Sequence, residues 1–405
     1  MDHNETLNYI KNNWQKTFHE SNEDVPYPYT SPSISEIVWF YYWDNYFIHK
    51  GLMLDGFGYQ VKNNLDNFAY FINKTGYMPN SSVLTDRSQP PLFAKCVWEY
   101  YLFVQDISVI EEYLPTILKE YDFWMTQRML PCGLNTYSCN ATEKQLLFAY
   151  DTLCDRVLEY RDSEREKIAL ARDILAVAES GLDFNMRFKT ERSKIDAGSF
   201  IHIDLNCIMY DVERIISKMY SLTGNDEKSD VFNLKAEKRK SLIDELLFDK
   251  DTGLYLDYDF VDKRFSETVT AVSFYPFTFG VSDDVLSAKK LLSRLELENG
   301  LCVGEYRGEN AIYYQWDYPC MWPAATCFAY MGLNNIGLKE DAARIAGKYV
   351  CAVDKNFKKT GILWEKYNAV TGDIGYSDEY ETPEMLGWTA AVYRYFIEEE
   401  NTIRS

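Results

Sequence analysis

The sequence predicts a nearly all-α fold, and three observations support this expectation. Apolar residues recur at helical spacing along most of the 405-residue chain. The exceptions are short: residues 247–259 fit a hairpin around an Asp-Thr-Gly turn, and residues 359–364 fit a turn that leads into a strand. No Gly/Ser-rich or Pro-rich linker divides the chain. We therefore expect one domain, residues 1–405, of paired helices whose loops carry the chemistry.

Each helix is predicted from the spacing of its apolar residues and, in places, from residues that cap a helix at its N-terminus. Val212, Ile215 and Met219 fall on one helical face, and charged residues fall off it. Ser163 and Glu166 have the spacing of a capping box, which predicts a helix start at this point. Along the chain, helices are expected at about 5–18, 44–54, 58–74, 90–104, 113–121, 164–178, 208–219, 227–247, 283–295, 320–332, 338–353 and 383–399.

Composition and charge exclude several classes of partner. The net charge of −20 repels nucleic acid and anionic membranes, so we expect a small, neutral ligand and no nucleic-acid or membrane partner. No apolar run is long enough to span a bilayer. The four histidines are scattered and no phosphate-binding glycine loop is present, so we expect no metal and no cofactor. The oligomeric state stays open.

The cysteines and the N-terminus bear on the cellular compartment. The nine cysteines are odd in number and none form a C-x-x-C pair. The first residues have neither a basic start nor an apolar run, so no signal peptide is indicated. Reduced thiols without a signal peptide are typical of a cytoplasmic protein, and we expect that location here.

Two carboxyl groups stand out among the 62 acidic residues. Asp183 follows a Ser-Gly break at a helix end and lies between Leu182 and Phe184. Apolar neighbours desolvate a carboxyl group and favour its neutral, proton-donating form. Glu365 lies far downstream and is flanked by aromatic residues. Such a pair fits glycoside hydrolysis, in which one acid donates a proton and the other activates water or attacks the sugar.

Other clusters combine aromatic rings with groups that bond hydroxyls. The aromatic content of 16% fits either a well-filled core or a cavity lined with rings. Near residue 90, a Pro-Pro pair can open a helix and leave Arg87, Ser88 and Gln89 displayed before it. Each cluster alone has a simpler explanation, such as an ion pair between Arg87 and Asp86. The clusters occupy residues 41–47, 78–80, 86–91, 315–322, 364–368 and 387–389.

Taken in this order, the clusters resemble the motifs of the trehalase family of glycoside hydrolases. The likeness runs from about residue 36 to residue 388, and the Arg87–Pro91 and Glu179–Phe184 stretches are its most specific parts. These enzymes hydrolyse the glycosidic bond with inversion of configuration at the anomeric carbon, and their fold is a ring of helix pairs. The resemblance thus implies an all-α, (α/α)6 toroid with short β-hairpins in the active-site loops.

The resemblance also implies roles for individual residues. Asp183 would be the general acid and Glu365 the general base. Because an inverting enzyme leaves room for a water molecule, the two carboxyl groups should lie roughly 6.5–9.5 Å apart. The residues that would line the sugar site are Trp43, Asp44, Asn80, Arg87, Gln89, Gly181 and Trp316.

The chain departs from the family pattern at three places. Residues 35–40 lack the arginines that trehalases carry before the Tyr-Tyr-Trp-Asp motif. An Arg-Pro-Glu stretch is missing near residues 147–151, and residues 373–378 replace a glycine-rich loop before Glu379-Tyr380. Since those arginines help grip the second sugar, their loss should relax or redirect the leaving-group side, while the side for the cleaved sugar keeps its specificity.

The expected function is therefore hydrolysis of an α-glucosidic bond with inversion, with α,α-trehalose or a related α-glucoside as the first choice of substrate. One alternative is a hydrolase of glucosylglycerate- or mannosylglycerate-type substrates. A phosphorylase would need a cationic phosphate pocket, for which the sequence shows no clustered candidate. A non-catalytic sugar-binding relative is the remaining alternative.

Overall fold

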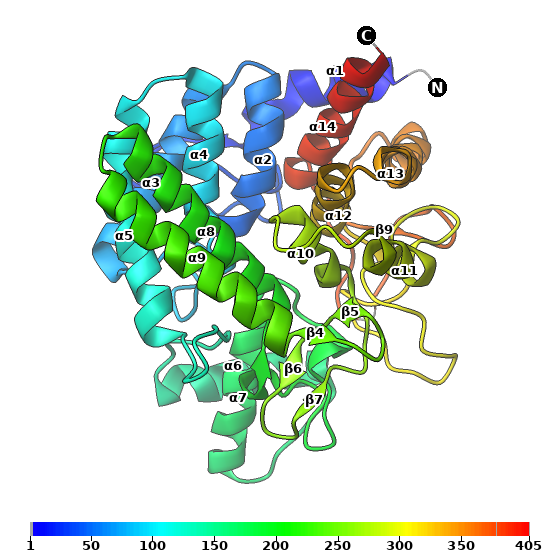
Figure 1. The fold of residues 1–405 in the computed structure, drawn as a ribbon. Helices are drawn as coiled ribbons and strands as arrows, with labels where there is room; N and C mark the ends of the chain where they lie inside the picture. Colours follow the sequence, from blue (N-terminus) through cyan, green and yellow to red (C-terminus); the bar gives the residue numbers. More distant parts are fainter. Residues whose placement is uncertain (1–2, 378, 405) are drawn as a thin grey trace.

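The helices pack in successive pairs around a ring (Figure 1). The computed structural model describes residues 3–377 and 379–404, so Asp378, the last residue of the 373–378 stretch, lies outside the described residues. Within the described ranges the α-helices are α1 (Asn4–Asn13), α2 (Tyr42–Leu54), α3 (Gly58–Thr75), α4 (Phe93–Val104), α5 (Ser108–Gln127), α6 (Glu143–Val157), α7 (Glu164–Glu179), α8 (Ile203–Leu222), α9 (Asp226–Leu246), α10 (Tyr275–Thr278), α11 (Val285–Leu295), α12 (Pro323–Asn335), α13 (Lys339–Thr360) and α14 (Gly387–Arg404).

Helices that follow one another in the chain lie against each other. Pairs α2–α3, α4–α5, α6–α7, α8–α9 and α12–α13 are in contact, and α14 returns to pack on α2. This last contact joins the two ends of the chain and closes the ring (Figure 1). The expected (α/α)6 toroid is confirmed, and an open solenoid, which would leave α2 and α14 apart, is excluded.

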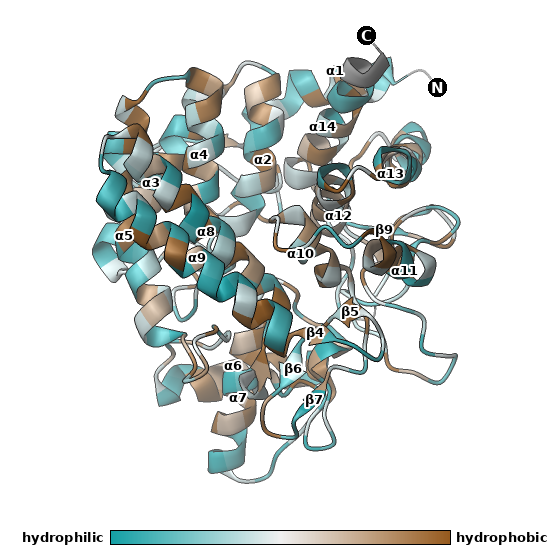
Figure 2. Cartoon of the chain, in the orientation of Figure 1, coloured by the Kyte–Doolittle hydropathy of each residue, from teal (hydrophilic) through white to brown (hydrophobic). Residues whose placement is uncertain are grey.

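The helices divide into inner and outer members by their burial. Every residue of α2 from Tyr42 to Leu52 is buried, as expected of a helix surrounded by other elements. In α9, by contrast, only Phe232, Ala236, Arg239 and Ile243 are buried, at the spacing of a single helical face. Figure 2 shows hydrophilic and hydrophobic colours alternating along α9, which fits an outer position.

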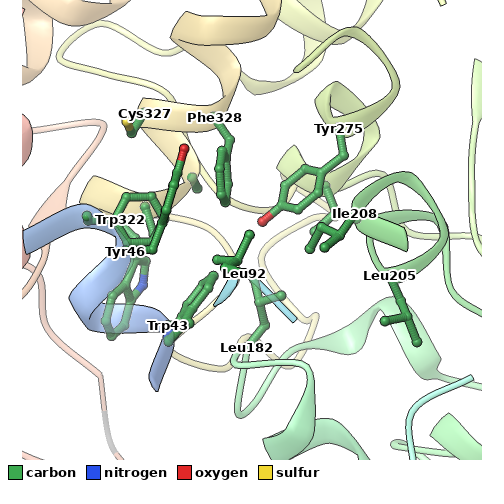
Figure 3. Close-up of a cluster of buried hydrophobic side chains, with 14 of the residues drawn as sticks. Trp43, Tyr46, Leu92, Leu182, Leu205, Ile208, Tyr275, Trp322, Cys327 and Phe328 are labelled. Atoms are coloured by element: carbon green, nitrogen blue, oxygen red, sulfur yellow. The ribbon is translucent and has the colours of Figure 1, made fainter. Parts of the chain in front are cut away.

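Side chains from the inner helices fill the middle of the ring. Figure 3 shows Tyr46 of α2, Ile208 of α8, Tyr275 of α10 and Phe328 of α12 pointing toward one another. The ring of Phe328 lies 4.9 Å from that of Tyr275 and 5.6 Å from that of Tyr46. The centre of the toroid is therefore a packed core, and a ligand site has to lie beyond this core, at one end of the ring.

Strands are short and join loops to one another. The predicted hairpin is confirmed, with Phe248 opposite Tyr255 and Asp249 opposite Leu254. The expected strand after residue 364 is present as well, but it pairs with a distant segment near residue 320. The strands are β1 (Phe18–His19), β2 (Tyr29–Thr30), β3 (Phe200–Ile201), β4 (Phe248–Asp249), β5 (Leu254–Tyr255), β6 (Tyr258–Asp259), β7 (Arg264–Phe265), β8 (Cys320–Met321) and β9 (Tyr367–Asn368).

Local start signals explain one helix that was expected and one that was missed. Ser163 and Glu166 form the predicted capping box of α7. Helix α6 was not expected, although Thr142 and Gln145 form an equivalent capping box at its start. The first predicted helix is also shorter than expected, since α1 ends at Asn13 and a 3-10 turn follows. None of the helices in the described ranges has the length and apolar content to span a lipid bilayer.

Candidate active site

One cavity of about 390 Å³ gathers the residues predicted from the sequence. They come from segments far apart in the chain, and most lie in loops or at a helix end, where connecting segments leave side chains free to meet a ligand. Two short backbone pairings bring the segments together: Tyr41 pairs with Ser81, and Met321 of β8 lies opposite Tyr367 of β9. All nine predicted residues line this cavity: Trp43, Asp44, Asn80, Arg87, Gln89, Gly181, Asp183, Trp316 and Glu365.

The segment that carries Asp183 leaves α7 through a tight turn. Gly181 has φ +77°, a left-handed conformation that favours glycine. Leu182 and Phe184 are buried and anchor the segment on either side of Asp183. The Asp183 side chain itself is 35% exposed, so its expected desolvation between apolar neighbours is not what the structure shows. The anchors point into the core while the carboxyl group faces the cavity.

Glu365 is the more deeply buried of the two carboxyl groups. Its backbone N–H donates to the carbonyl of Pro383, which fixes the segment. The ammonium of Lys366 lies 2.8 Å from Oε2, and the hydroxyl of Tyr380 donates to both carboxylate oxygens, at 3.1 and 2.9 Å. Burial raises the pKa of Glu365, while Lys366 and Tyr380 favour the charged form and limit that rise. Lys366 and Tyr380 therefore fix the carboxyl group in place and stabilise its charged form, while burial strengthens its affinity for a proton.

Arg156, at the end of α6, joins the acid to the segment that carries Tyr380. Its Nη2 lies 3.4 Å from Oδ2 of Asp183 and donates to the Asp183 carbonyl at 3.1 Å. Its Nε and Nη2 both donate to Oε2 of Glu379, at 3.1 and 2.9 Å. Burial raises the pKa of Glu379, and Arg156 opposes that rise. The sequence analysis named Glu379 only as part of a family motif and gave it no role, and it missed Arg156 because it missed helix α6.

Tryptophan rings form one wall of the cavity. Trp316 stacks on Trp322 with ring centres 3.8 Å apart and planes at 10°. Trp43 lies 5.8 Å from Trp316, and Trp388 meets Trp322 edge-on at 5.6 Å. A Cβ atom on Gly181 would lie 3.0 Å from the Trp43 ring, so glycine is needed there for space as well as for its backbone. Flat apolar rings beside carboxyl groups suit a sugar, which has apolar faces and polar edges.

A buried carboxylate holds the Arg87–Gln89 segment in place. Glu179 is fully buried and accepts a hydrogen bond from the Ser88 backbone N–H at 3.0 Å. It also binds Arg128 through both oxygens, at 2.9 Å each. The side chain of Gln89 in turn accepts a bond from the backbone N–H of Trp43 at 3.1 Å. These hydrogen bonds therefore connect the end of α7, the Arg87–Gln89 segment and the start of α2.

Two donors in the cavity wall are buried without a protein acceptor in the described part of the chain. They are Nε of Arg87 and Nε1 of Trp388. The Nη1 atom of Arg87 does contact Asp86 at 2.6 Å, as the simpler explanation of that arginine supposed. The ion pair leaves Nε of Arg87 buried and without an acceptor, and a buried unpaired donor lowers the stability of the fold around it.

Asp44 adds a further buried carboxyl group to the cavity. Burial raises its pKa to about 7, and the charges of Glu365 and Asp183 contribute in the same direction. A group with this pKa carries a proton for part of the time near neutrality and can both donate and accept hydrogen bonds. That dual capacity suits contact with a sugar hydroxyl.

A separate group of potential metal ligands lies outside the cavity. His202, Asp204 and Asp257 bring ligating atoms within 4.8 Å of one another. The guanidinium of Arg187 already lies 2.8 Å from Asp204 and 3.2 Å from Asp257. Burial lowers the pKa of His202, and the charge of Arg187 lowers it further. A cation would have to compete with this arginine, so the cluster fits a structural ion-pair network.

Comparison with known proteins identifies the family. A family model described as Trehalase matches residues 11–401. The chain belongs to the trehalase family. A trehalase named periplasmic, from Pseudomonas aeruginosa, is 31% identical over 398 residues, which cover 92% of this chain and 71% of the relative. The protein is therefore a glycoside hydrolase, as the cavity with its two carboxyl groups indicated.

Solved structures of other proteins confirm the fold of this trehalase-family member. The neutral trehalase of Saccharomyces cerevisiae superposes with a TM-score of 0.77 at 22% identity, covering 97% of this chain and 79% of that one. A mannosylglycerate hydrolase of Thermus thermophilus gives a TM-score of 0.66 at 16% identity, covering 96% and 99%. At these identities the likeness establishes the toroid and leaves the substrate to the site.

The cytoplasmic location expected from the sequence is wrong. Family members from Shigella flexneri and Pseudomonas aeruginosa are named periplasmic trehalases. All nine cysteines are free, and six of them are buried. Because the six buried thiols are enclosed in the core, they stay unpaired whatever the redox state outside, so the cysteine count does not report the compartment.

Proposed function

We propose that this protein hydrolyses α,α-trehalose, or a closely related α-glucoside, with inversion at the cleaved sugar. Asp183 acts as general acid and Glu365 as general base. The observation that carries the proposal is the shared cavity: both carboxyl groups line it, and Glu365 is bonded to Lys366 and to the hydroxyl of Tyr380. A carboxylate fixed in this way accepts a proton from water without moving.

The reaction follows from these assignments. Asp183 gives its proton to the glycosidic oxygen as the bond from that oxygen to the anomeric carbon breaks. Water attacks the anomeric carbon from the other face of the ring and loses its proton to Glu365. The products are two neutral sugars, one of them released with inverted configuration. The carboxyl separation of roughly 6.5–9.5 Å that inversion requires stays a prediction.

The charges in the cavity favour a neutral substrate. Four carboxyl groups line it, namely Asp44, Asp86, Asp183 and Glu365, but only two arginines. Arg87 is paired with Asp86, and Arg156 is paired with Glu379 and Asp183. No arginine of this lining is thus left for the anionic group of a phosphate or a glycerate. This argues against a phosphorylase and against the glycerate-type substrates.

The decisive experiment combines a substrate panel with the anomeric form of the product. The purified protein is incubated with trehalose, kojibiose, maltose, glucosylglycerate and mannosylglycerate, with and without phosphate, and early product is followed by NMR. We expect glucose from trehalose without dependence on phosphate, with equal initial amounts of β-glucose from the attacked ring and α-glucose from the leaving ring. Early product that is α-glucose alone would refute inversion, and binding without turnover across the panel would support a non-catalytic role.

Variants test the two catalytic assignments. Asp183→Asn and Glu365→Gln should each lower kcat by about 100-fold or more, the usual contribution of a general acid or base. Asp283→Asn, an exposed aspartate outside the cavity, is the control. Thermal unfolding should show that all three variants fold. Near-normal turnover of trehalose by either catalytic variant would contradict its assignment.

Arg87 offers a test of sugar binding. Arg87→Lys keeps the charge but removes the Nε donor and the planar fork. We expect a higher KM for trehalose, because Arg87 lines the cavity and a lysine cannot reproduce the hydrogen-bonding geometry of its guanidinium. Arg344→Lys, in a surface pair with Glu296, is the matched control. An unchanged KM in Arg87→Lys would leave Arg87 as a purely structural partner of Asp86.

We propose further that residues 1–405 form a single catalytic domain that uses neither metal nor cofactor. The family model covers nearly the whole chain, and the buried apolar residues form one connected cluster. The net charge of −20 supports the absence of a nucleic-acid partner. Limited proteolysis that released a stably folded fragment would contradict a single domain.

A further inference from the structure

The cavity wall nearest the acid is one face of α6. Five residues of this helix line the cavity: Phe148, Ala149, Thr152, Leu153 and Arg156. Their spacing of one, four, five and eight positions from Phe148 places them on a single helical face. The end of that face touches the acid, since Arg156 contacts both the carboxylate and the carbonyl of Asp183.

This wall runs from the acid to the cavity mouth. Phe148 and Arg156 are eight residues apart, which corresponds to about 12 Å along a helix. Arg156 is 24% exposed, whereas Phe148 is 70% exposed. The helix therefore extends outward from the acid over a distance that fits a sugar ring or a group of similar size. Since the acid protonates the oxygen that leaves, the leaving group lies on this side of the cavity.

Polar side chains on this side already have protein partners. Arg156 binds Glu379, and the hydroxyl of Thr152 donates to the carbonyl of Phe148 at 2.8 Å. Asp86, which also lines the cavity, is paired with Arg87. These polar side chains are thus already engaged within the protein.

Apolar side chains, by contrast, are exposed around the mouth. Phe148 and Leu84 are 70% and 36% exposed, and both line the cavity. Leu153 and Ile37 are half-buried in the same lining. These four come from three separate segments of the chain and converge on one opening. An exposed phenylalanine at the entrance of a polar site gains its stabilising contact only when an apolar surface covers it.

We propose that Phe148, Leu153 and Leu84 form an apolar leaving-group subsite, with Phe148 as its specificity-determining residue. It selects the leaving group by contact with an apolar face and not by a network of hydrogen bonds. The substrate class is therefore α-glucosides whose leaving group presents such a face, aryl α-glucosides included. This inference rests on the proposed α-glucoside hydrolysis and specifies its leaving-group side.

The experiment compares three substrates that differ only in the leaving group. p-Nitrophenyl α-glucoside places an aromatic ring in the subsite, trehalose places a glucose there, and α-glucosyl fluoride places only a fluoride. Phe148→Ala should lower kcat/KM for the aryl glucoside by about tenfold, the lower range for a lost apolar contact in a pocket. Hydrolysis of α-glucosyl fluoride should be unchanged, because its leaving group does not reach Phe148. Phe148→Tyr keeps the ring face and should retain the aryl glucoside activity.

A matched control is available on the outer ring. Leu234 of α9 is 69% exposed and lies outside the cavity, so Leu234→Ala makes a comparable surface change. It should leave all three substrates unaffected. Equal losses with the aryl glucoside and the fluoride in Phe148→Ala would indicate a structural effect and overturn the proposal. So would an unchanged aryl glucoside activity, or a wild-type protein that cleaves trehalose but not the aryl glucoside.

The same panel separates this inference from the function on which it rests. If the wild-type protein hydrolyses neither α-glucosyl fluoride nor trehalose, α-glucoside hydrolysis itself is refuted. If it hydrolyses the fluoride and the Phe148→Ala variant behaves like the wild type with every substrate, only the leaving-group subsite is refuted.

Discussion

The hydroxyl of Tyr380 should set the lower pH limit of activity through its bond to Glu365. It donates to both oxygens of that carboxylate, at 3.1 and 2.9 Å, and so favours the ionised form. In Tyr380→Phe this donor is lost, while Lys366 keeps its contact at 2.8 Å. Hydrogen bonds to a charged group contribute about 1.5–3 kcal/mol. One pKa unit corresponds to about 1.36 kcal/mol, so the pKa of Glu365 should rise by about 1–2 units.

The direction of the pH effect follows from the role of the base. Glu365 acts ionised, so a higher pKa leaves less active enzyme at a given acidic pH. The cavity is open to water, which replaces part of the lost bond, and we therefore expect the lower end of the range. The pKa that limits kcat/KM on the acidic side of the pH profile should rise by about 1 unit. At pH values below this pKa in both wild type and variant, kcat/KM of the variant should be about tenfold lower, and on the plateau it should change little.

The assay is glucose release from trehalose across the pH range, for wild type and variant. Tyr121→Phe is the matched control, because Tyr121 donates to Glu213 at 3.0 Å and Arg239 binds the same carboxylate, in a buried site away from the catalytic cavity. This variant should lower the melting temperature without moving the acidic limb. The reasoning is refuted if Tyr380→Phe keeps the wild-type limb, or if both variants shift it equally.

Two further predictions concern the support of the site. Gly181→Ala should lose about 1–2 kcal/mol of stability from its left-handed backbone and also lower kcat/KM, since its Cβ would press on Trp43 at 3.0 Å. Gly76→Ala, where the added Cβ would meet no other residue within 4 Å, should show only the stability loss in the same unfolding and kinetic assays. Glu179→Ala breaks a buried pair and should lower the free energy of unfolding by about 3–5 kcal/mol, whereas Lys62→Met, on the surface, should cost about 1 kcal/mol or less in urea unfolding. A small effect of Glu179→Ala would show that this pair does not hold the Arg87 segment.

The sequence by itself determined what depends on neighbours in the chain. The capping box of Ser163 and Glu166, the face of α8 and the turn of the β4–β5 hairpin all arise within a few residues. The motif residues were found because their chemical types and order are readable without a structure. Helix α6 could have been found in the same way, since Thr142 and Gln145 carry a capping box.

The tertiary structure alone decided how distant residues meet. Asp183 and Glu365 share a cavity because the ring closes through α14 on α2 and because β8 pairs with β9. It also left Asp183 partly exposed, although its apolar neighbours predicted desolvation, and it enclosed Glu365. The hydrogen bonds of helices and capping boxes link residues three or four positions apart, so the residues close by in the sequence determine them. The burial and charge of a site residue depend on segments that fold over it, which no local spacing encodes.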